Sequence, residues 1–370
     1  MPTTLIITND FPPRVGGIES FVADVVDLLG RDVVVFTSST PGSEAADRRL
    51  GLEVIRSGSV LLPTPATTRQ AMQILRQSGA TRVLFGAAAP LGLMAGSLRR
   101  AGAERIVALS HGHETWWATL PGSRSLLRRI GDEVDVLGTI SDYTAGRISP
   151  ALSRRARERV IRLPPPVDLD RFRPDPAASA ARPRAIAVGR LVRQKGFDTL
   201  LRAWTLVQKD WPVSTQRPEL VIVGDGPRRP HLESILNRLD LNSTVRLVGR
   251  MSRSAVIAEL QAAHVFVLPV RTRLGGLNPE GLGLAAIEAA ACALPVIVGR
   301  SGGAPETVLD GGSGFVVEPT DEREVAARLR SLLLAPATAQ RMGARGRVHV
   351  REKFGSERVG QALREALDVI

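Results

Sequence analysis

The feature that most restricts the fold of this chain is an alternation of short apolar runs with longer amphipathic segments. A strand inside a parallel sheet is apolar on both faces, whereas a helix that covers the sheet is apolar on one face only. The alternation therefore predicts an α/β fold with doubly wound parallel sheets. In the first half the predicted strands are Thr4–Thr8, Val33–Thr37, Arg82–Phe85, Ile106–Ser110 and Val136–Ile140, and the helices between them include Ile18–Leu29, Thr67–Gln77 and Leu91–Ala101.

The alternation stops at a proline-rich segment, Pro164–Pro183, and then starts again. Because 370 residues exceed the size at which one core usually keeps growing, we expect two domains, at 1–163 and 184–354, joined by a linker at 164–183. In open α/β sheets ligands bind at the carboxyl ends of the strands, so two Rossmann-like domains facing each other predict a cleft that holds the site. The predicted strands of the second half are Ala185–Val188, Leu220–Val223, Thr244–Leu247, Val265–Leu268 and Pro295–Val298.

The charge of the chain indicates the kind of partner. The formal net charge is +12, carried by 46 Arg and 3 Lys against 37 acidic residues. Such a charge attracts nucleotide phosphates, acidic lipid head groups or nucleic acid. An aromatic content of 4% and the lack of a recognised nucleic-acid-binding motif argue against nucleic acid.

The apolar segments and the single cysteine indicate the compartment. Cys292 lies in an apolar stretch and cannot form a disulfide within the chain, so we expect a buried thiol in a reducing environment. The N-terminus lacks the pattern of a signal peptide. The most apolar window, Leu282–Val298, is interrupted by Glu288 and Pro295, which is typical of a helix followed by a strand and not of a membrane span. We therefore expect a cytoplasmic protein, soluble or peripheral on a membrane.

Two glycines follow the first predicted strand. Gly16 and Gly17 lie in the segment Asn9–Glu19, which opens a helix. Backbone N–H groups at this position would cradle a diphosphate or let an acceptor approach closely. A plain strand-to-helix turn is an equal alternative.

Two of the five histidines follow the fourth predicted strand, in the run Ser110–Glu114. A histidine at the carboxyl end of a strand would shuttle a proton or polarise a hydroxyl, and either His111 or His113 fits that role. A zinc site is disfavoured, because no further cluster of Cys or His supplies the remaining ligands.

The loop Gly189–Gly196 follows the first strand of the second half and carries two cations. Arg190 and Lys195 are five residues apart and would converge on one anion, with the guanidinium as a planar fork and the ammonium as a point charge. A solvated charge cluster is the alternative, but Lys195 is one of only three lysines in the chain.

The strongest motif is a glycine-rich loop that leads into an apolar helix, Gly275–Ala289. Its predicted first-turn N–H groups, at Gly281, Leu282, Gly283 and Leu284, would bind an anion. Glu280 is placed at the helix start and Glu288 about two turns further along. A carboxylate among apolar residues needs a partner, and the paired hydroxyls of a ribose would satisfy Glu288. A structural carboxylate that is satisfied within the protein is the alternative.

Two further motifs are weak indications of function. Gly302–Glu306 follows the next strand and is consistent with a simple turn before a helix. Asp168 and Asp170 have the D-x-D spacing of some metal-dependent sugar transferases, but they lie in the predicted linker, so we expect solvated turn residues and no metal site.

The ordered set of motifs resembles the retaining glycosyltransferases of the GT-B fold, glycosyltransferase family 4. The resemblance covers nearly the whole chain: P-P-x-x-G-G near the start, H-G-x-E midway, G-R-L-x-x-x-K-G after the linker and E-x7-E from Glu280 to Glu288. The runs 8–14, 85–91, 110–114 and 301–307 look like the actinobacterial GDP-mannose-dependent mannosyltransferases that add the second mannose of phosphatidylinositol mannosides.

The resemblance implies a role for each site residue. Arg190 and Lys195 would bind the diphosphate of GDP-mannose, and Glu288 would hold the ribose. Glu280 would contact the mannose hydroxyls, and the backbone at Arg250 and Met251 would border the base.

It also implies that His111 lies between the donor and the acceptor, and that a C-terminal helix at about 355–370 crosses back onto the first domain. No metal is expected, so the cations and the helix N-terminus would stabilise the leaving diphosphate. The acceptor would be an anionic inositol phospholipid, reached by peripheral binding to the inner face of the plasma membrane. The arginines at 124, 128 and 129 would contact the membrane, or would lie on a solvated helix face.

Two departures from the family pattern leave donor and acceptor open. Pro165-Pro166 replaces an Asn-Gly pair, and the loop Arg273–Pro279 lacks a further glycine and an acidic residue. A family 4 transferase with another nucleotide sugar or acceptor is therefore the first alternative, and a GT-B-fold epimerase the second.

Overall fold

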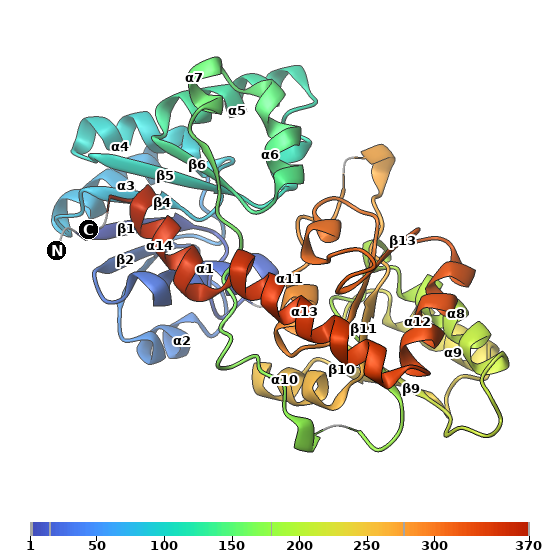
Figure 1. Ribbon diagram of the computed structural model, residues 1–370. Coiled ribbons are helices and arrows are strands. Elements are labelled where there is room, and N and C mark those ends of the chain that lie inside the picture. Colours follow the sequence, from blue (N-terminus) through green and yellow to red (C-terminus); the bar gives the residue numbers. More distant parts are fainter. Residues whose placement is uncertain (1–2, 15, 179, 277, 369–370) are drawn as a thin grey trace. The chain divides into compact units, whose positions relative to one another are not determined.

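The computed structural model describes residues 3–14, 16–178, 180–276 and 278–368, except for the side chains of His113 and Pro176. The chain forms two compact units (Figure 1). The first contains the residues up to Pro166 and those from Ser356 onward, and the second contains Val167–Gly355.

The first unit is built on a parallel sheet of seven strands in the order β3-β2-β1-β4-β5-β6-β7. The order runs outward from β1 in both directions, so the sheet is doubly wound and its switch point lies between β1 and β4. The strands are β1 (Thr4–Thr8), β2 (Val33–Thr37), β3 (Glu53–Arg56), β4 (Arg82–Phe85), β5 (Arg105–Ser110), β6 (Val136–Thr139) and β7 (Val160–Arg162).

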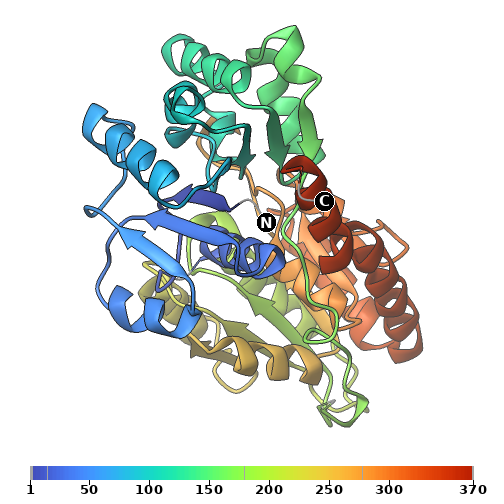
Figure 2. The ribbon, with the colours of Figure 1, turned by 90° about the vertical axis from the view of Figure 1, so that its left-hand side faces the viewer.

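Helices cover both faces of this sheet (Figures 1 and 2). On one face α3, α4 and α5 pack side by side, and α1 packs against α14. The helices are α1 (Gly17–Leu29), α2 (Ser43–Leu50), α3 (Pro65–Gln77), α4 (Ala95–Ala101), α5 (Pro121–Glu133), α6 (Asp142–Ile148), α7 (Arg154–Arg157) and α14 (Ser356–Ala366).

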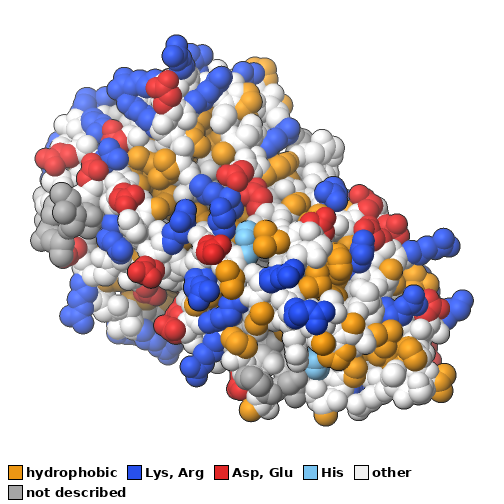
Figure 3. Space-filling model, viewed as in Figure 1, with side chains coloured by type: hydrophobic (Ala, Val, Ile, Leu, Met, Phe, Trp, Pro, Cys, Tyr) orange, Lys and Arg blue, Asp and Glu red, His pale blue; other side chains and the backbone are white. Residues whose placement is uncertain are grey.

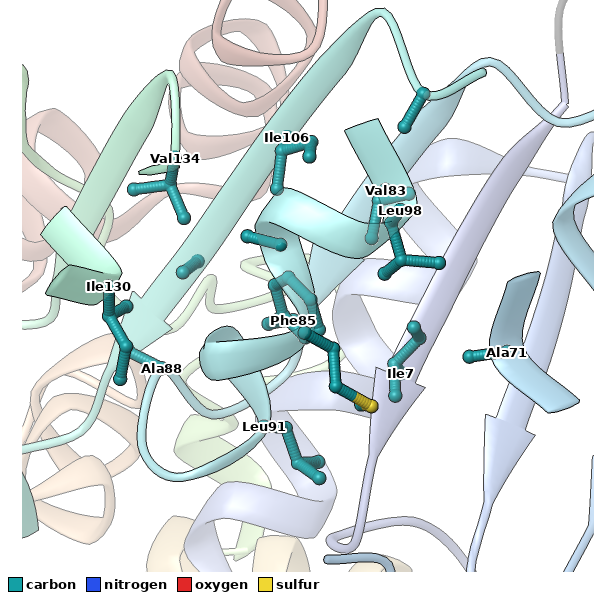
Figure 4. Close-up of a cluster of buried hydrophobic side chains, with 14 of the residues drawn as sticks. Ile7, Ala71, Val83, Phe85, Ala88, Leu91, Leu98, Ile106, Ile130 and Val134 are labelled. Atoms are coloured by element: carbon teal, nitrogen blue, oxygen red, sulfur yellow. The ribbon is translucent and has the colours of Figure 1, made fainter. Parts of the chain in front are cut away.

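The core of the first unit lies between the sheet and the helices α3, α4 and α5 (Figure 4). Ile7, Phe85 and Ile106 extend from neighbouring strands, and Leu98 and Ile130 face them from α4 and α5. All five side chains are fully buried. Truncation of one of them to alanine would cost about 2–5 kcal/mol of stability.

The second unit repeats the architecture with six parallel strands in the order β10-β9-β8-β11-β12-β13. Its switch point lies between β8 and β11. The strands are β8 (Arg184–Val188), β9 (Glu219–Val223), β10 (Val245–Gly249), β11 (Val265–Leu268), β12 (Val296–Gly299) and β13 (Gly314–Val317).

The helices of the second unit pack against one another in two groups. Helix α12 packs against α8, which also contacts α9, while α11 packs against α13. The helices are α8 (Phe197–Lys209), α9 (Arg229–Arg238), α10 (Arg253–Ala262), α11 (Leu284–Ala291), α12 (Glu322–Leu333) and α13 (Pro336–Phe354). Side-chain caps fix several helix starts; for example, Ser252 Oγ accepts a hydrogen bond from Ala255 N at 3.3 Å at the start of α10.

All ten strands predicted from the apolar runs are present, but three further strands were missed. These are β3, β7 and β13, and each lies at the edge of its sheet. The residues of β3 and β7 are exposed or only half-buried. An edge strand of this kind needs no continuous apolar run, so the periodicity of the sequence does not reveal it.

The segment predicted as a linker at 164–183 divides between the two units. Its first three residues belong to the first unit, and the rest to the second. Phe172 is fully buried, and its backbone oxygen accepts a hydrogen bond from Arg347 Nη1 at 2.7 Å. Val167 N donates to Phe354 O at 2.7 Å. The proline-rich segment is therefore not a solvated linker throughout, because the buried side chain of Phe172 anchors it in the second unit.

The C-terminal region contains two consecutive helices. Helix α13 belongs to the second unit, and α14 belongs to the first, where it packs on α1. Arg105 Nε of β5 donates to Ala366 O at 2.8 Å at the end of α14. None of the helices in the described part of the chain is both long and apolar enough to cross a membrane.

Candidate functional site

Three loops meet at the carboxyl edge of the second sheet, because β8, β11 and β12 are neighbours in it. They are the segment 189–196 after β8, the segment 269–283 after β11 and the segment 300–303 after β12. Parallel strands end at the same edge, so residues far apart in sequence come together there.

Lys195 and Glu280 form an ion pair at this edge. Lys195 Nζ donates to Glu280 Oε2 at 2.8 Å, across 85 residues of sequence. The two side chains are 20% and 11% exposed, so the pair is largely shielded from water. Arg190 lies on the same loop with an exposed side chain. Its convergence with Lys195 on one anion stays a prediction.

The backbone around Glu280 is held by the loop after β12. Glu280 N donates to Ser301 Oγ at 3.2 Å, and Gly303 N donates to Glu280 O at 2.9 Å. Gly302 has a φ of +56°, and a Cβ at this position would lie 1.8 Å from Glu280 O. Gly302, in a motif that by sequence indicates only a simple turn, therefore allows the two loops to touch.

The predicted position of Glu280 at a helix start is wrong. Helix α11 begins at Leu284, with Gly283 before it at a φ of +101°. Gly281 and Leu282 therefore lie in the loop, and Leu282 buries its side chain. Of the four residues predicted to offer first-turn N–H groups, only Leu284 is in the helix, because the left-handed backbone of Gly283 stands directly before the first turn.

Glu288 lies on α11 and has a cationic neighbour that the sequence did not reveal. Arg253 Nη2, from the start of α10, lies 4.0 Å from Glu288 Oε1. The Arg253 guanidinium in turn lies 5.5 Å from the centre of the Phe172 ring. The Glu288 carboxylate was expected to need a partner, and Arg253 is one such partner. Arg250 and Met251, predicted to border a base, precede α10, with Arg250 exposed and Met251 half-buried.

Arg271 and Gln194 tie the loops after β8 and β11 together. Arg271 Nε donates to Arg193 O at 2.8 Å, and Gln194 Nε2 donates to Pro279 O at 2.7 Å. Arg271 Nη2 also contacts both carboxylate oxygens of Asp198, at 2.7 and 2.8 Å. Burial raises the pKa of Asp198, but the hydrogen bond and charge of Arg271 outweigh it, so the pKa lies below its usual value.

A second pair of glycines, Gly224 and Gly226, supports the loop after β8 and was not among the predicted site residues. A Cβ at Gly224 would lie 2.0 Å from Gly189 O, and one at Gly226 would lie 2.8 Å from Leu191 O. Leu191 N donates to Asp225 O at 3.0 Å between them. The spacing Gly-x-Gly directly after a predicted strand was the available signal.

In the first unit, His111 lies at the end of β5 and is buried. Its Nε2 is hydrogen-bonded to Gly86 O, and its ring meets the Phe21 ring edge-on at 5.4 Å. A carbonyl can only accept, so Nε2 carries a proton. The side chain of His113 lies outside the described residues.

Glu114 fixes the backbone next to this histidine. Its Oε2 accepts hydrogen bonds from His111 N and Ser110 Oγ, each at 3.0 Å, and the side chain is fully buried. The glutamate of the H-G-x-E motif therefore has a structural task in the loop.

The two glycines before α1 differ in their surroundings. Gly17 begins the helix, and a Cβ there would meet nothing within 4 Å. A Cβ at Gly16 would lie 2.3 Å from Glu19 Oε2. The amino end of α1 thus already has a carboxylate beside it. A diphosphate cradle at this position stays a prediction.

The D-x-D residues form a turn, as expected. Asp168 Oδ1 accepts hydrogen bonds from Asp170 N at 2.9 Å and Arg171 N at 3.0 Å. Both aspartates are exposed. Within the described parts of the chain, no three His, Cys, Asp or Glu side chains are grouped so that they could hold a metal ion.

Cys292 is buried, as predicted, at the end of α11. Burial, reinforced by the charge of Glu288, raises the pKa of its thiol to about 12. A thiol with this pKa stays protonated near neutral pH, so Cys292 is not a nucleophile.

Comparison with known proteins covers both units. The family model described as Glycosyltransferase Family 4 matches residues 15–171, and the one described as Glycosyl transferases group 1 matches residues 169–349. The chain is 42% identical to the GDP-mannose-dependent monoacylated alpha-(1-6)-phosphatidylinositol monomannoside mannosyltransferase of Corynebacterium glutamicum, over 98% of this chain and 97% of the relative. It is 40% identical to the GDP-mannose-dependent alpha-(1-6)-phosphatidylinositol monomannoside mannosyltransferase of Mycolicibacterium smegmatis, over 98% and 97% of the two chains.

The fold also has solved counterparts. The crystal structure of Anabaena HepE in complex with UDP and glucose matches with a TM-score of 0.82, covering 100% of both chains at 14% sequence identity. At this identity the likeness shows the fold, two Rossmann-like units of the GT-B class, and confirms the predicted fold class.

Proposed function

This chain belongs to the glycosyltransferase family of the actinobacterial phosphatidylinositol monomannoside mannosyltransferases, and we propose that it transfers mannose from GDP-mannose to a phosphatidylinositol mannoside, adding the second mannose. The observation that carries the proposal is the identity of 42% over 98% of the chain, because it spans both units.

The diphosphate of the donor would bind at Lys195, with Arg190 on the same loop as the second cation. Lys195 is hydrogen-bonded to Glu280, so it is held in place at the sheet edge before any anion contacts it. An ammonium fixed in this way stabilises charge on the leaving diphosphate without reorganising in the transition state. In this proposal the cationic side chains of the protein balance the charge of the diphosphate, and no metal is required.

Glu288 would accept hydrogen bonds from the ribose hydroxyls. One of its oxygens, Oε1, is 4.0 Å from Arg253 Nη2 on α10. A ribose hydroxyl would donate a charge-assisted hydrogen bond to this carboxylate. Arg250 and Met251 lead directly into the helix that carries Arg253, which supports their proposed place beside the base.

Glu280 would orient the mannose hydroxyls. Its carboxylate is already hydrogen-bonded to Lys195 and its backbone is fixed by Ser301 and Gly303, so it is suited to position the sugar and poorly suited to act as a covalent nucleophile. His111 of the first unit would contact the sugar.

We propose that transfer retains the anomeric configuration. The bond between mannose C1 and the diphosphate oxygen breaks, and the acceptor hydroxyl oxygen bonds to C1 on the same face. The departing phosphate oxygen takes the acceptor's proton. The protein supplies orientation and charge stabilisation, and the phosphate supplies the base.

The acceptor is an anionic lipid, so the enzyme would work on a membrane surface, on the cytoplasmic face where GDP-mannose is available. The first unit suits this task through its charge: up to Arg162 it contains 20 Arg against 15 acidic residues.

The test is incubation of the purified protein with radiolabelled GDP-mannose and phosphatidylinositol monomannoside, followed by separation of the lipids. A labelled dimannoside with retained configuration is expected. Turnover of another nucleotide sugar, with none of GDP-mannose, would overturn the donor, and conversion of the donor sugar to an isomer would indicate an epimerase.

The donor site has a test of its own. Glu288→Gln should weaken GDP affinity at least tenfold, because one hydrogen bond to a charged group contributes about 1.5–3 kcal/mol. Glu352→Gln, on an exposed part of α13, is the matched control and should bind GDP as the wild type does. Equal affinity in the two variants would remove Glu288 from the site.

A further inference from the structure

One arginine of the first unit joins three separate segments of the chain. Arg56, the last residue of β3, contacts Asp47 on α2 through two nitrogens: Nε lies 2.8 Å from Oδ2, and Nη2 lies 2.7 Å from Oδ1. Nη1 donates to Ser38 O at 2.8 Å, and Nη2 also donates to Pro12 O at 2.5 Å. The guanidinium therefore links α2, the segment after β2 and the loop after β1.

Burial distinguishes this ion pair from an ordinary surface pair. Acidic and basic side chains are interspersed over the face of the first unit in Figure 3, and exposed pairs of that kind contribute little to stability. The side chains of Arg56 and Asp47 are instead only 10% and 21% exposed. A two-point contact between a guanidinium and a carboxylate fixes the orientation of the fork as well as its place. The other N–H groups of Arg56 are thus aimed at the two carbonyls.

The loop after β1 contains two prolines and therefore depends on side-chain donors. We call residues 9–14 the β1 loop. Pro12 and Pro13 have no N–H group, so neither can donate a backbone hydrogen bond, and Arg56 fixes the chain here by donating to a carbonyl. Asn9 secures the start of the loop, because its side-chain amide exchanges two hydrogen bonds with the backbone of Leu61, at 2.6 and 2.9 Å.

The β1 loop borders the switch point of the first sheet, between β1 and β4. In doubly wound sheets ligands bind in the crevice at this point. The segment after β4 is close, since a Cβ at Gly86 would lie 2.7 Å from Thr8 at the end of β1, and Gly86 O is hydrogen-bonded to His111 Nε2. Arg56 comes from β3, on the other side of β1 from β4. It therefore holds the loop from the side remote from the crevice.

We propose that the Arg56–Asp47 pair is a positioning device for the lipid acceptor: its guanidinium fork fixes Pro12 O, and with it the β1 loop at the crevice, and touches neither substrate. The inference rests on the proposed function, in which the first unit receives the acceptor. A loop that is held in place before the acceptor arrives loses less conformational entropy on binding. Arg56 thus determines how tightly the acceptor binds, whereas the donor site of the second unit does not depend on it.

The test compares Arg56 with an arginine of the same unit that makes similar contacts. Arg99 Nη2 lies 2.7 Å from Asp135 Oδ2, and Arg99 Nη1 donates to Glu104 O at 2.9 Å, so Arg99 also joins a carboxylate to a backbone carbonyl. Asp135 directly precedes β6, which places this pair at the amino edge of the sheet, opposite the crevice. Arg99→Gln is therefore the matched control for Arg56→Gln.

Both variants should melt at a lower temperature than wild type, because each loses an ion pair and its carbonyl contacts. Only Arg56→Gln should raise the KM for phosphatidylinositol monomannoside, with kcat largely kept, since a displaced loop weakens binding in the ground state and the transition state alike. Substitutions that act through a contact network change binding by about 2- to 30-fold, and we expect a rise of about tenfold. GDP affinity, measured by calorimetry, should match wild type in both variants. Equal acceptor KM values in the two variants, or a loss of GDP affinity in Arg56→Gln, would overturn the inference.

A lysine variant tests the fork itself. Arg56→Lys keeps the charge but replaces the planar fork by a single ammonium, so the melting temperature should recover in part while the acceptor KM stays high. Full recovery of the KM would show that charge alone is sufficient and would overturn the proposal.

A substitution of the partner tests the pair as a unit, and it also serves if Arg56→Gln is too unstable to assay. Asp47→Asn loosens the fork without removing it and should raise the acceptor KM in the same direction. The double variant Arg56→Gln/Asp47→Asn should have the same KM as Arg56→Gln, because residues in one ion pair do not act additively. Additive increases in KM would contradict the proposal.

Hydrogen exchange of the β1 loop separates this inference from the proposed function. A peptide that spans residues 4–14 should exchange faster in Arg56→Gln than in wild type and in Arg99→Gln, because the loop loses a fixed contact. If wild type transfers no mannose, the proposed function fails, and the exchange rates still decide whether Arg56 holds the loop. Equal exchange in the three proteins would overturn the inference even if the enzyme is active.

Discussion

An alanine at position 302 should disable sugar transfer. Gly302 has a φ of +56°, and an added Cβ would lie 1.8 Å from the backbone oxygen of Glu280. Ordinary van der Waals contact begins at 3.4 Å, so the two backbones would have to separate by about 1.6 Å, which is 3.4 − 1.8. The carboxylate of Glu280 would move with its backbone and leave Lys195. Because a misplacement of about 1 Å costs about 100-fold in rate, we expect kcat to fall by at least that factor.

The strain of the left-handed backbone needs a control. Gly311 has a φ of +72°, but a Cβ there would meet nothing within 4 Å. Gly311→Ala therefore incurs only the backbone penalty of about 1–2 kcal/mol, whereas Gly302→Ala incurs it together with the collision.

The assay compares kcat with GDP-mannose and the lipid acceptor, GDP affinity by calorimetry and the melting temperature. Both variants should melt lower than wild type, and only Gly302→Ala should lose transfer, with GDP binding largely kept. If the two variants transfer mannose at the same rate, the contact between the loops after β11 and β12 does not position Glu280.

Three further predictions concern single side chains. Lys195→Gln should lower kcat about 100- to 1,000-fold, because it removes a fixed cation at the diphosphate. Lys195→Arg keeps the charge and should recover part of the rate. Steady-state kinetics measure both variants, and a near-normal rate for Lys195→Gln would contradict the proposed site. Cys292 should resist iodoacetamide near neutral pH in the folded protein and react after unfolding, because its thiol pKa is about 12, and mass spectrometry of the labelled protein checks this. Asp198 has a folded pKa below its ordinary 3.8, so its pairing with Arg271 stabilises the fold above about pH 4 and is lost as the pH falls through the folded pKa. The melting temperature of Asp198→Asn should therefore lie below that of wild type at neutral pH and approach it in acid; a gap that stays constant across this range would contradict the coupling.

The sequence by itself determined the α/β class and the edge of the sheet at which we propose that the donor binds. Buried strands need continuous apolar runs, and these runs ended directly before His111 and before the loops that carry Lys195 and Glu280. The order of the motifs was sufficient to predict the family, which the relatives confirm.

Only the tertiary structure decided which of these residues touch. Lys195 meets Glu280 because β8 lies next to β11, and Arg253 meets Glu288 because α10 and α11 lie near each other; neither adjacency follows from local periodicity. The same holds for Gly302, whose need for glycine comes from a backbone 22 residues away. Local patterns record what each segment buries, whereas contacts between loops depend on the order of strands in the sheet, and that order is set by the packing of the whole unit.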